Sequence, residues 1–323
     1  MSRRRWKPTR VRCEEDGERA NGDAVRKASH IEKPFIVDGE SLDMIVPGSR
    51  TQTLAAELAT ETGRELAAVS FDRFPDGEGY VRVHDAPDHA VVVASTVSDG
   101  SHVELLQLHD AVREAGAREV TTVIPYMGYA RQERAFSEGE AVSARAVAQA
   151  ISTGTDRVVT VNPHEDVVCE YFDVPAEAVD AAAQLAEPLP DLADPLFLSP
   201  DAGAIDIATT VRDAYGDGET DYFEKTRHSG TEVEIEPRDA DVEGRDVVVA
   251  DDIIATGSTM SEAVAILDER GANRVFVTCV HPLLARSAYL NLQRAGVESI
   301  YGTDTIEHTV SQVSAAPVIA ERL

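Results

Sequence analysis

The chain has 323 residues, a formal net charge of −28 and a sequence pI of about 4.6. Its length allows two domains with separate hydrophobic cores, and its negative charge disfavours nucleic acid and anionic membranes as partners. No apolar run is long enough to span a membrane, and no secretory signal is recognisable. The three cysteines are scattered without metal-ligand spacing, which favours a reducing cytoplasm.

The negative charge is unevenly distributed. Residues 1–43 carry ten basic and nine acidic side chains without a hydrophobic period, so we predict a disordered extension. Residues 44–323 carry 20 basic and 49 acidic side chains, a composition similar to that of proteins from salt-accumulating halophiles. At molar salt the Debye length falls to roughly 3 Å, so we expect a halophilic protein that is unstable at low salt.

The first predicted domain begins at Met44 with a strand, a Gly-Ser turn and an amphipathic helix that ends at Gly63. A strand over Leu66–Phe71 follows, and an alternating strand covers Tyr80–Val83. The loop between these strands contains Phe74, Asp76, Gly77 and Glu78. Read by itself, its Asp-Gly pair favours a hairpin turn.

An internal repeat then indicates two related α/β halves. The segment VVVAS at Val91–Ser95 matches VVVAD at Val247–Asp251, and GAREV at Gly116–Val120 matches GANRV at Gly271–Val275. Both copies predict a strand, a polar loop, a helix and a second strand. In the first copy, Ser101 and Glu104 have the spacing of a helix-capping box.

A basic loop follows the next strand, which ends at Pro125. Arg131 and Gln132 lie in it behind two tyrosines, and a helix over Glu140–Ile151 comes next. A planar guanidinium can bind phosphate through two hydrogen bonds or stack on a purine. A solvated basic turn that pairs with local acids explains these residues equally well.

Polar side chains follow two further predicted strands. His164 comes directly after Asp156–Val161, and Asp201 after Leu196–Leu198, at the strand ends where doubly wound folds bind ligands. A lone histidine is more often structural than a metal ligand. Lys225 and Arg227 lie two positions apart in a segment that also fits an exposed hairpin.

The most informative stretch is 246–271, DVVVADDIIATGSTMSEAVAILDERG. An apolar strand leads to Asp251 and Asp252, then to a loop of small residues and a helix, for which Thr259 and Glu262 have capping-box spacing. The loop consists of Ala255, Thr256, Gly257, Ser258 and Thr259. A tight turn at a helix N-terminus suits a phosphate, and neighbouring carboxylates can accept hydrogen bonds from sugar hydroxyls, so the stretch favours a sugar phosphate. The alternative is an ordinary strand–turn–helix with solvated acids.

The chain contains, in this order, the motifs FPDGE, PYMGYARQER, NPHE, SPDAG, EKTRH and VVVADDIIATGST. Their order and spacing resemble those of the ribose-phosphate pyrophosphokinase family. NPHE and Ala255 resemble the archaeal members of that family. The resemblance implies an α/β fold of two tandem phosphoribosyltransferase-like domains, each a mainly parallel sheet flanked by helices. It implies boundaries at residues 44–181 and 182–305, with residues 306–323 packing back on the first domain.

The resemblance also implies a reaction, in which the β,γ-diphosphoryl group of ATP moves to the C1 hydroxyl of ribose 5-phosphate with Mg²⁺ as cofactor. The implied catalytic residues are Lys225 and Arg227, and the implied metal-placing residues are His164 and Asp201. The implied ATP-binding residues are Phe74, Asp76, Gly77, Glu78, Arg131 and Gln132. The implied ribose 5-phosphate-binding residues are Arg227, Asp251, Asp252, Ala255, Thr256, Gly257, Ser258 and Thr259.

Family resemblance places the adenine contacts of Phe74, Asp76 and Glu78 in a neighbouring subunit, so a homo-oligomer, at least a dimer, is expected. Two other functions stay open on the sequence. A non-catalytic regulatory homologue would be expected to lose the cationic pair Lys225 and Arg227. A type I phosphoribosyltransferase would share only the last motif and a single domain.

Overall fold

The computed structural model describes residues 42–229, 232–238 and 240–323, and the side chains of 225–236 are outside this description. The predicted disorder of residues 1–41 therefore lies outside the described residues. Asp43 is described, and it already belongs to the first strand. No described helix has the length and apolar character needed to cross a membrane.

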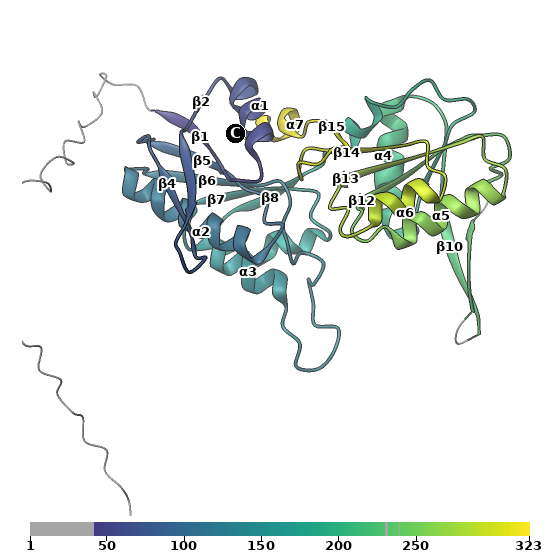
Figure 1. The fold of residues 1–323 in the computed structure, drawn as a ribbon, viewed down its shortest axis with the longest axis horizontal. Helices are drawn as coiled ribbons and strands as arrows, with labels where there is room; N and C mark the ends of the chain where they lie inside the picture. Colours follow the sequence, from purple (N-terminus) through teal and green to yellow (C-terminus); the bar gives the residue numbers. More distant parts are fainter. Residues whose placement is uncertain (1–41, 230–231, 239) are drawn as a thin grey trace, which may run out of the picture. The chain divides into compact units, whose positions relative to one another are not determined.

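The first half of the chain builds a six-stranded sheet in the order β2-β1-β5-β6-β7-β8, in which all neighbours are parallel (Figure 1). Its strands are β1 (Asp43–Pro47), β2 (Glu65–Leu66), β5 (His89–Val93), β6 (Glu119–Ile124), β7 (Arg157–Val161) and β8 (Ala176–Val179). Its helices are α1 (Gln52–Thr62), α2 (Asp99–Ala115), α3 (Ser143–Ser152) and the short 3₁₀ helix η1 (Asp166–Tyr171). Strands β3 (Val69–Arg73) and β4 (Gly79–Val83) form a separate antiparallel hairpin.

The second half builds a seven-stranded sheet in the order β11-β10-β9-β12-β13-β14-β15, and only the pair β10–β11 is antiparallel. Its strands are β9 (Leu196–Ser199), β10 (Glu219–Ser229), β11 (Glu232–Pro237), β12 (Asp246–Ile253), β13 (Arg274–His281), β14 (Ser299–Thr303) and β15 (Ser311–Val313). Its helices are η2 (Ala182–Ala186), η3 (Ala202–Ala204), α4 (Ile205–Tyr215), α5 (Ser258–Glu269), α6 (Ala288–Arg294) and α7 (Ala316–Ala320).

The predicted repeat is confirmed by the strand order. Strand β5 lies between β1 and β6 in the first sheet, as β12 lies between β9 and β13 in the second. Alternate residues of each central strand are buried on opposite faces. Val91 packs in the same core as α1, whereas Val92 packs in the core under α2 and α3.

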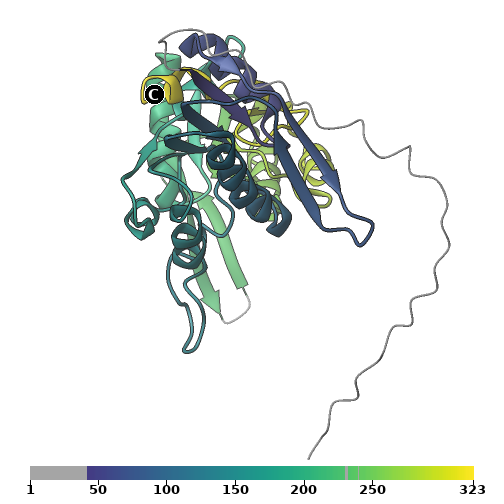
Figure 2. The ribbon, with the colours of Figure 1, turned by 90° about the vertical axis from the view of Figure 1, so that its left-hand side faces the viewer.

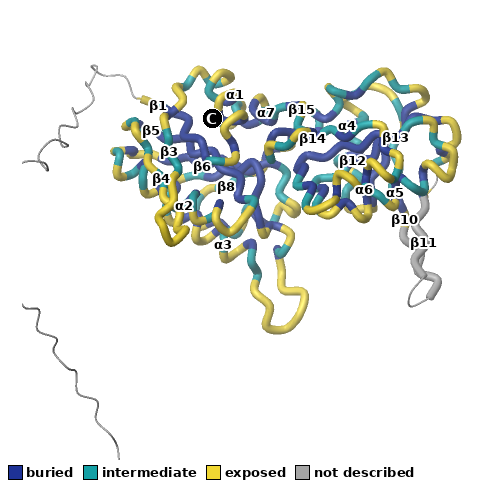
Figure 3. Tube along the Cα trace, viewed as in Figure 1, coloured by how far each residue is buried: buried dark blue, intermediate teal, exposed yellow. Residues whose placement is uncertain are grey.

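Within the described residues, buried hydrophobic side chains form three clusters, one of which contains residues of both sheets. Figure 3 colours the buried segments dark blue. The shared core joins Ile45 and Leu54 of the first half to Phe197 and Phe276 of the second. The C-terminal helix α7 contributes Ile319 to it and lies against α1 (Figure 2). Leu323 is held there as well, because the Arg64 guanidinium donates to its main-chain oxygen at 2.8 Å.

Several predicted boundaries were wrong for identifiable local reasons. The single strand predicted over 66–71 is split into β2 and β3, which belong to different sheets. Helix α2 is capped by Ser98, whose side chain accepts from the Ser101 amide, while Glu104 binds Ser49 instead of completing a capping box. Helix α5 begins after Gly257 without a side-chain cap, so the Thr259 and Glu262 box is also absent.

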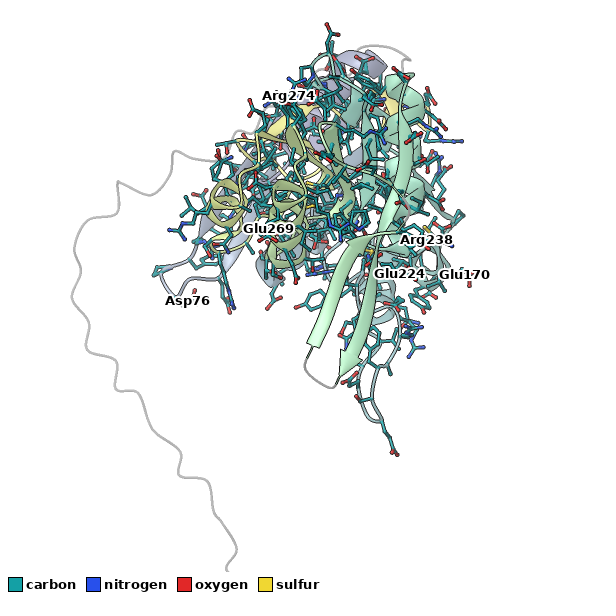
Figure 4. All side chains as sticks on the ribbon, turned by 90° about the vertical axis from the view of Figure 1, so that its right-hand side faces the viewer. Asp76, Glu170, Glu224, Arg238, Glu269 and Arg274 are labelled. Carbon is teal, nitrogen blue, oxygen red and sulfur yellow. The ribbon has the colours of Figure 1, made fainter. Side chains whose placement is uncertain are left out.

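Strand β12 is anchored at its start by a buried carboxylate. Asp246 accepts hydrogen bonds from the Ala193 amide at 2.7 Å and from Asn273 at 2.8 Å. It also accepts two from Arg274, a side chain labelled in Figure 4. Burial alone would raise the pKa of Asp246, but these hydrogen bonds outweigh it and lower that pKa. The strand that carries Asp251 and Asp252 is therefore fixed in position at its far end.

A second buried carboxylate, Asp304, is less well compensated. It is 6% exposed, and burial together with the charge of Glu57 raises its pKa to about 6. Because the folded state prefers the protonated form, stability should fall as pH rises from the ordinary aspartate value to about 6 and then stay level.

We therefore expect Asp304→Asn to stabilise the fold at pH 7.5 by about 1–2 kcal/mol, since a neutral amide avoids the buried charge. Thermal melting between pH 4 and 8 measures this, with Asp72→Asn on the exposed end of β3 as the matched control. A lower melting temperature for Asp304→Asn at pH 7.5 would show that the ionised carboxylate stabilises the fold.

Candidate active site

The carboxyl ends of β7 and β12 bring two sequence-predicted groups into contact. The His164 imidazole Nδ1 lies 2.8 Å from a carboxylate oxygen of Asp252. His164 comes from the first half of the chain and Asp252 from the second, so the pair joins the two halves at their strand ends. The hydrogen bond to Asp252 raises the pKa of His164, although burial acts in the opposite direction.

The neighbouring acids differ in their electrostatics. Burial and the adjacent Asp252 charge raise the pKa of Asp251 well above its ordinary value. Burial also acts to raise the pKa of Asp252, but the hydrogen bond and positive charge of His164 outweigh it and lower that pKa. Of the two adjacent, half-buried carboxyl groups, Asp251 therefore keeps its proton more readily than Asp252.

A small pocket of about 10 Å³ lies beside this pair. Its lining includes Arg131 from the basic loop together with His164 and Asp252, so three of the sequence-predicted binding residues meet there. A volume of that size holds about one water molecule. The pocket lining also includes Tyr126 and His281, to which the sequence prediction assigned no role.

The small-residue loop after β12 turns sharply into α5. Gly257 has φ +70°, a left-handed conformation that suits glycine. The loop is held from beneath, because the Ala285 amide donates to the Ala255 carbonyl oxygen at 2.8 Å. Thr256, Ser258 and Thr259 are exposed, and the Thr256 and Ser258 hydroxyls lie 3.2 Å apart. The first amides of α5 and two hydroxyls are thus available at one exposed turn.

The basic loop is anchored to the first half at several points. The Gly128 amide donates to the Thr96 hydroxyl at 2.9 Å, and the Gln132 amide donates to the Tyr129 carbonyl oxygen at 3.0 Å. The Gln132 side chain accepts from the Ser143 hydroxyl. Helix α3 begins at Ser143 and not at Glu140 as predicted, and the Glu140 carboxylate instead accepts from the Phe136 and Ser137 amides. Arg131 itself is exposed.

The segment with Phe74, Asp76, Gly77 and Glu78 forms the tip of the β3–β4 hairpin, as its Asp-Gly pair favours. Gly77 has φ +97°, and Phe74 is 51% exposed with its ring 4.6 Å from that of Tyr80. Asp76 is labelled at the hairpin tip in Figure 4. No hydrogen bond or ring contact given for the described residues links this tip to Arg131 or His164.

Two predicted catalytic residues lie on β10, where Lys225 pairs with Ile235 and Arg227 with Val233 of β11. The side chains of both lie outside the described residues. Asp201 begins η3 after β9, and its side chain accepts from the Gly203 amide at 3.0 Å. Its charge acts on Asp251, which indicates proximity of the two carboxyl groups.

Magnesium favours oxygen ligands and usually keeps several waters, with one or two carboxylates and substrate phosphates completing its shell. In the part of the chain that the structure describes, no three His, Cys, Asp or Glu side chains are grouped closely enough to enclose a metal. The carboxylates of Asp201 and Asp252 at the strand ends nevertheless fit the modest protein share of such a shell, and His164 suits a contact through water.

Sequence comparisons assign both halves. Residues 44–154 match the N-terminal domain of ribose phosphate pyrophosphokinase, and residues 170–314 match the phosphoribosyl transferase domain. The ribose-phosphate pyrophosphokinase of Halobacterium salinarum is 64% identical over 283 residues, which cover 87% of this chain and 100% of that protein. That of Methanosarcina mazei is 46% identical over 283 residues, 86% of this chain and 94% of that protein.

A solved structure agrees with this assignment. The phosphoribosylpyrophosphate synthetase from Mycobacterium smegmatis has a TM-score of 0.74 and 28% identity, covering 87% of this chain and 97% of its own. The similarity thus extends across both sheets and their helices, in the order that the internal repeat predicts. With both domains present and a relative matched along its whole length, the chain belongs to the ribose-phosphate pyrophosphokinase family.

Proposed function

We propose that this chain transfers the β,γ-diphosphoryl group of ATP to the C1 hydroxyl of ribose 5-phosphate, giving 5-phosphoribosyl 1-diphosphate and AMP for nucleotide biosynthesis. The observation that carries the proposal is that Arg131, His164 and Asp252 line the same small pocket. Arg131 is a cation suited to binding ATP phosphates, His164 can help to place a metal ion, and Asp252 can accept hydrogen bonds from ribose hydroxyls. Scattered cysteines favour a reducing cytoplasm as the place of this reaction.

Diphosphoryl transfer depends mainly on positioning and on neutralising negative charge. We assign Arg131 and Gln132 to ATP. Asp251 and Asp252 are assigned to the ribose hydroxyls, and residues 255–259 to the 5-phosphate. Bound Mg²⁺, held by Asp201 and through His164, would neutralise phosphate charge. Lys225 and Arg227 on β10 are assigned to the transferring group, and Arg227 also to ribose 5-phosphate.

Lys225 stands out in the composition of the folded part. It is the only lysine after Lys33 in the sequence, and all other basic Lys or Arg side chains after Lys33 are arginines. An ammonium group is a compact point charge with three rotatable donors, unlike the planar guanidinium. The single lysine therefore supports a task at this position that arginine performs less well.

The reaction is tested by AMP formation at molar KCl with ATP, Mg²⁺ and ribose 5-phosphate, omitting each in turn. We expect AMP only when all three are present, together with a product that a phosphoribosyltransferase can consume. A regulatory homologue would bind the sugar phosphate without turnover. A type I phosphoribosyltransferase would consume 5-phosphoribosyl 1-diphosphate without ATP, although the chain matches the N-terminal kinase domain as well.

The phosphate loop gives a sharper expectation. Gly257→Ala places a Cβ about 3.1 Å from the Ala288 Cβ in a backbone conformation with φ +70°. The loop must shift to relieve this contact, so we expect the KM for ribose 5-phosphate to rise by about tenfold while the KM for ATP changes little. Steady-state kinetics measures both constants.

Gly271→Ala is the matched control at the other end of α5, because Gly271 has φ +80° but its added Cβ meets only the Glu243 side chain at 3.6 Å. It should lower stability by a similar amount, about 1 kcal/mol, without changing either KM. Equal effects of the two substitutions on the KM for ribose 5-phosphate would argue against a phosphate cradle at 255–259.

We further propose that Phe74, Asp76, Gly77 and Glu78 contact ATP bound to a neighbouring subunit. The support is the exposed aromatic tip of the β3–β4 hairpin, where Phe74 and Tyr80 are 51% and 38% exposed. This arrangement requires a homo-oligomer, at least a dimer, for activity. Sedimentation under assay conditions tests it, and a fully active monomer would contradict it.

A further inference from the structure

A second contact joins the two halves of the chain beside the His164–Asp252 pair. His281 ends β13, and its backbone pairs with β12 next to Asp252, where Ile253 lies opposite it and the Ile254 amide donates to its carbonyl oxygen at 3.2 Å. Its side chain reaches across to the first half, where Nε2 donates to the Asn162 carbonyl oxygen at 3.1 Å. Two neighbouring hydrogen bonds therefore join the halves here, one between Asp252 and His164 and one between His281 and Asn162.

The two links differ in exposure. The His164 side chain is 41% exposed, whereas His281 is 3% exposed and its ring lies edge-on to Tyr126 at 5.2 Å between ring centres. The other nitrogen of His281, Nδ1, lies 2.9 Å from the Thr305 hydroxyl. Because a carbonyl oxygen can only accept, Nε2 carries the proton that it donates to Asn162. The Thr305 hydroxyl also lies 2.8 Å from the Val280 carbonyl oxygen, so its one proton serves either that oxygen or Nδ1.

Thr305 extends this buried contact into the first half. Its carbonyl oxygen accepts from the Ser95 hydroxyl at 2.5 Å, and Ser95 in turn accepts from the Tyr126 amide at 3.1 Å. Tyr126 opens the basic loop that contains Arg131. His281 and Thr305 therefore bind the starting points of both first-half loops that reach the pocket.

Asn162, which accepts the His281 hydrogen bond, has an unusual backbone conformation. Its φ of +34° is left-handed, a conformation that costs a non-glycine residue roughly 1 kcal/mol or more. Three contacts come from β8 and the residues after it: the Asn162 amide donates to Val179, its side-chain nitrogen to Asp180, and its side-chain oxygen accepts from Ala181. The His281 bond is the one described contact of these four that comes from the second half.

We propose that His281 is a positioning residue: by donating to the Asn162 carbonyl, it holds the turn at residues 162–164 so that His164 faces Asp252. As a role in turnover this inference rests on the proposed function, whereas the orientation of His164 can be measured independently of turnover. The competing explanation is that His281 merely fills space beneath Tyr126, in which case its size would matter and its N–H donor would not.

The test compares His281→Gln with His281→Met. The two side chains have the same length, but only Gln offers an N–H as far from the backbone as imidazole Nε2. Both lose the ring contact with Tyr126. We expect His281→Met to lower kcat by roughly 10- to 100-fold with a KM for ribose 5-phosphate within about threefold of the parent, as for other groups that act by orienting a site residue. His281→Gln should recover most of that loss.

The second readout is the ¹⁵N NMR signal of the His164 ring at one fixed pH, assigned by its absence in His164→Gln. It should move in His281→Met and stay in place in His281→Gln. If His281→Met does not fold, His281→Asn replaces it, since its shorter amide reaches towards Thr305 and not Asn162.

Equal kcat values and equal His164 signals in the donor and non-donor variants would overturn the proposal, as would activity that simply follows the melting temperature. If the parent protein forms no AMP, the proposed function fails. A His164 signal that moves only in the variants without a donor would still support the positioning role in that case.

Discussion

Replacing Lys225 with alanine is expected to lower kcat for AMP formation by about 10³-fold or more, with little change in ribose 5-phosphate affinity. The reason is that one cation placed on a transferring phosphoryl group is worth about 10³–10⁵ in rate, because the charge it neutralises is largest in the transition state. Single-turnover AMP formation and equilibrium binding of ribose 5-phosphate measure the two quantities separately.

Two further variants make this result specific. Arg238→Ala removes one positive charge just after β11, where Arg238 binds the Tyr222 hydroxyl at 2.6 Å, and should leave turnover within about twofold. Lys225→Arg keeps the charge but not the shape of the ammonium group and should recover only part of the rate. A near-normal rate for Lys225→Ala would exclude Lys225 from the transfer step.

The adjacent acids Asp251 and Asp252 should respond very differently to the same chemical change. Since burial and the neighbouring charge raise the pKa of Asp251 well above its ordinary value, Asp251→Asn replaces the carboxyl group that keeps its proton more readily. The hydrogen bond and charge of His164 lower the pKa of Asp252, so Asp252→Asn removes the carboxylate charge and weakens the hydrogen bond to His164. We expect kcat/KM for ribose 5-phosphate to fall less than about tenfold in the first variant and about 10²–10³-fold in the second.

The two variants are matched in size and in position along β12, so each serves as the control for the other. Measuring kcat/KM at a single pH near 7.5 with saturating ATP is sufficient. Similar losses in the two variants would show that the opposite pKa shifts of Asp251 and Asp252 in the free protein do not persist when the sugar binds. A larger loss in Asp251→Asn would show that the sugar depends on the charge of Asp251 and not on that of Asp252.

Most of the fold was predictable because its strongest signals are local. The apolar runs at 91–93 and 247–249 mark strands buried on both faces, and the matching segments after them revealed the duplicated sheet order. One error occurred where a side chain has a distant partner. Glu104 does not cap its helix and instead binds Ser49, which is 55 residues away. The local sequence pattern does not predict that contact.

The same limit applies to the site. Asp252 and His164 were each recognisable from a strand end, but their contact spans 88 residues and depends on how the two sheets meet. His281 also ends a strand, yet no local pattern distinguishes it from any other buried histidine. The positioning role proposed for His281 depends on its hydrogen bond to Asn162. The left-handed backbone of Asn162 and its four hydrogen bonds are visible only in three dimensions.

The most direct test of the central claim is the fate of the ATP phosphorus atoms in a single turnover. Enzyme in excess is mixed at molar KCl with equimolar ATP and ribose 5-phosphate and with Mg²⁺, and the products are resolved by ³¹P NMR. Diphosphoryl transfer predicts AMP and a sugar carrying two linked phosphates at C1, in equal amounts and without ADP. ADP with a singly phosphorylated C1 would instead mean transfer of the γ-phosphoryl group alone and would contradict the proposed reaction.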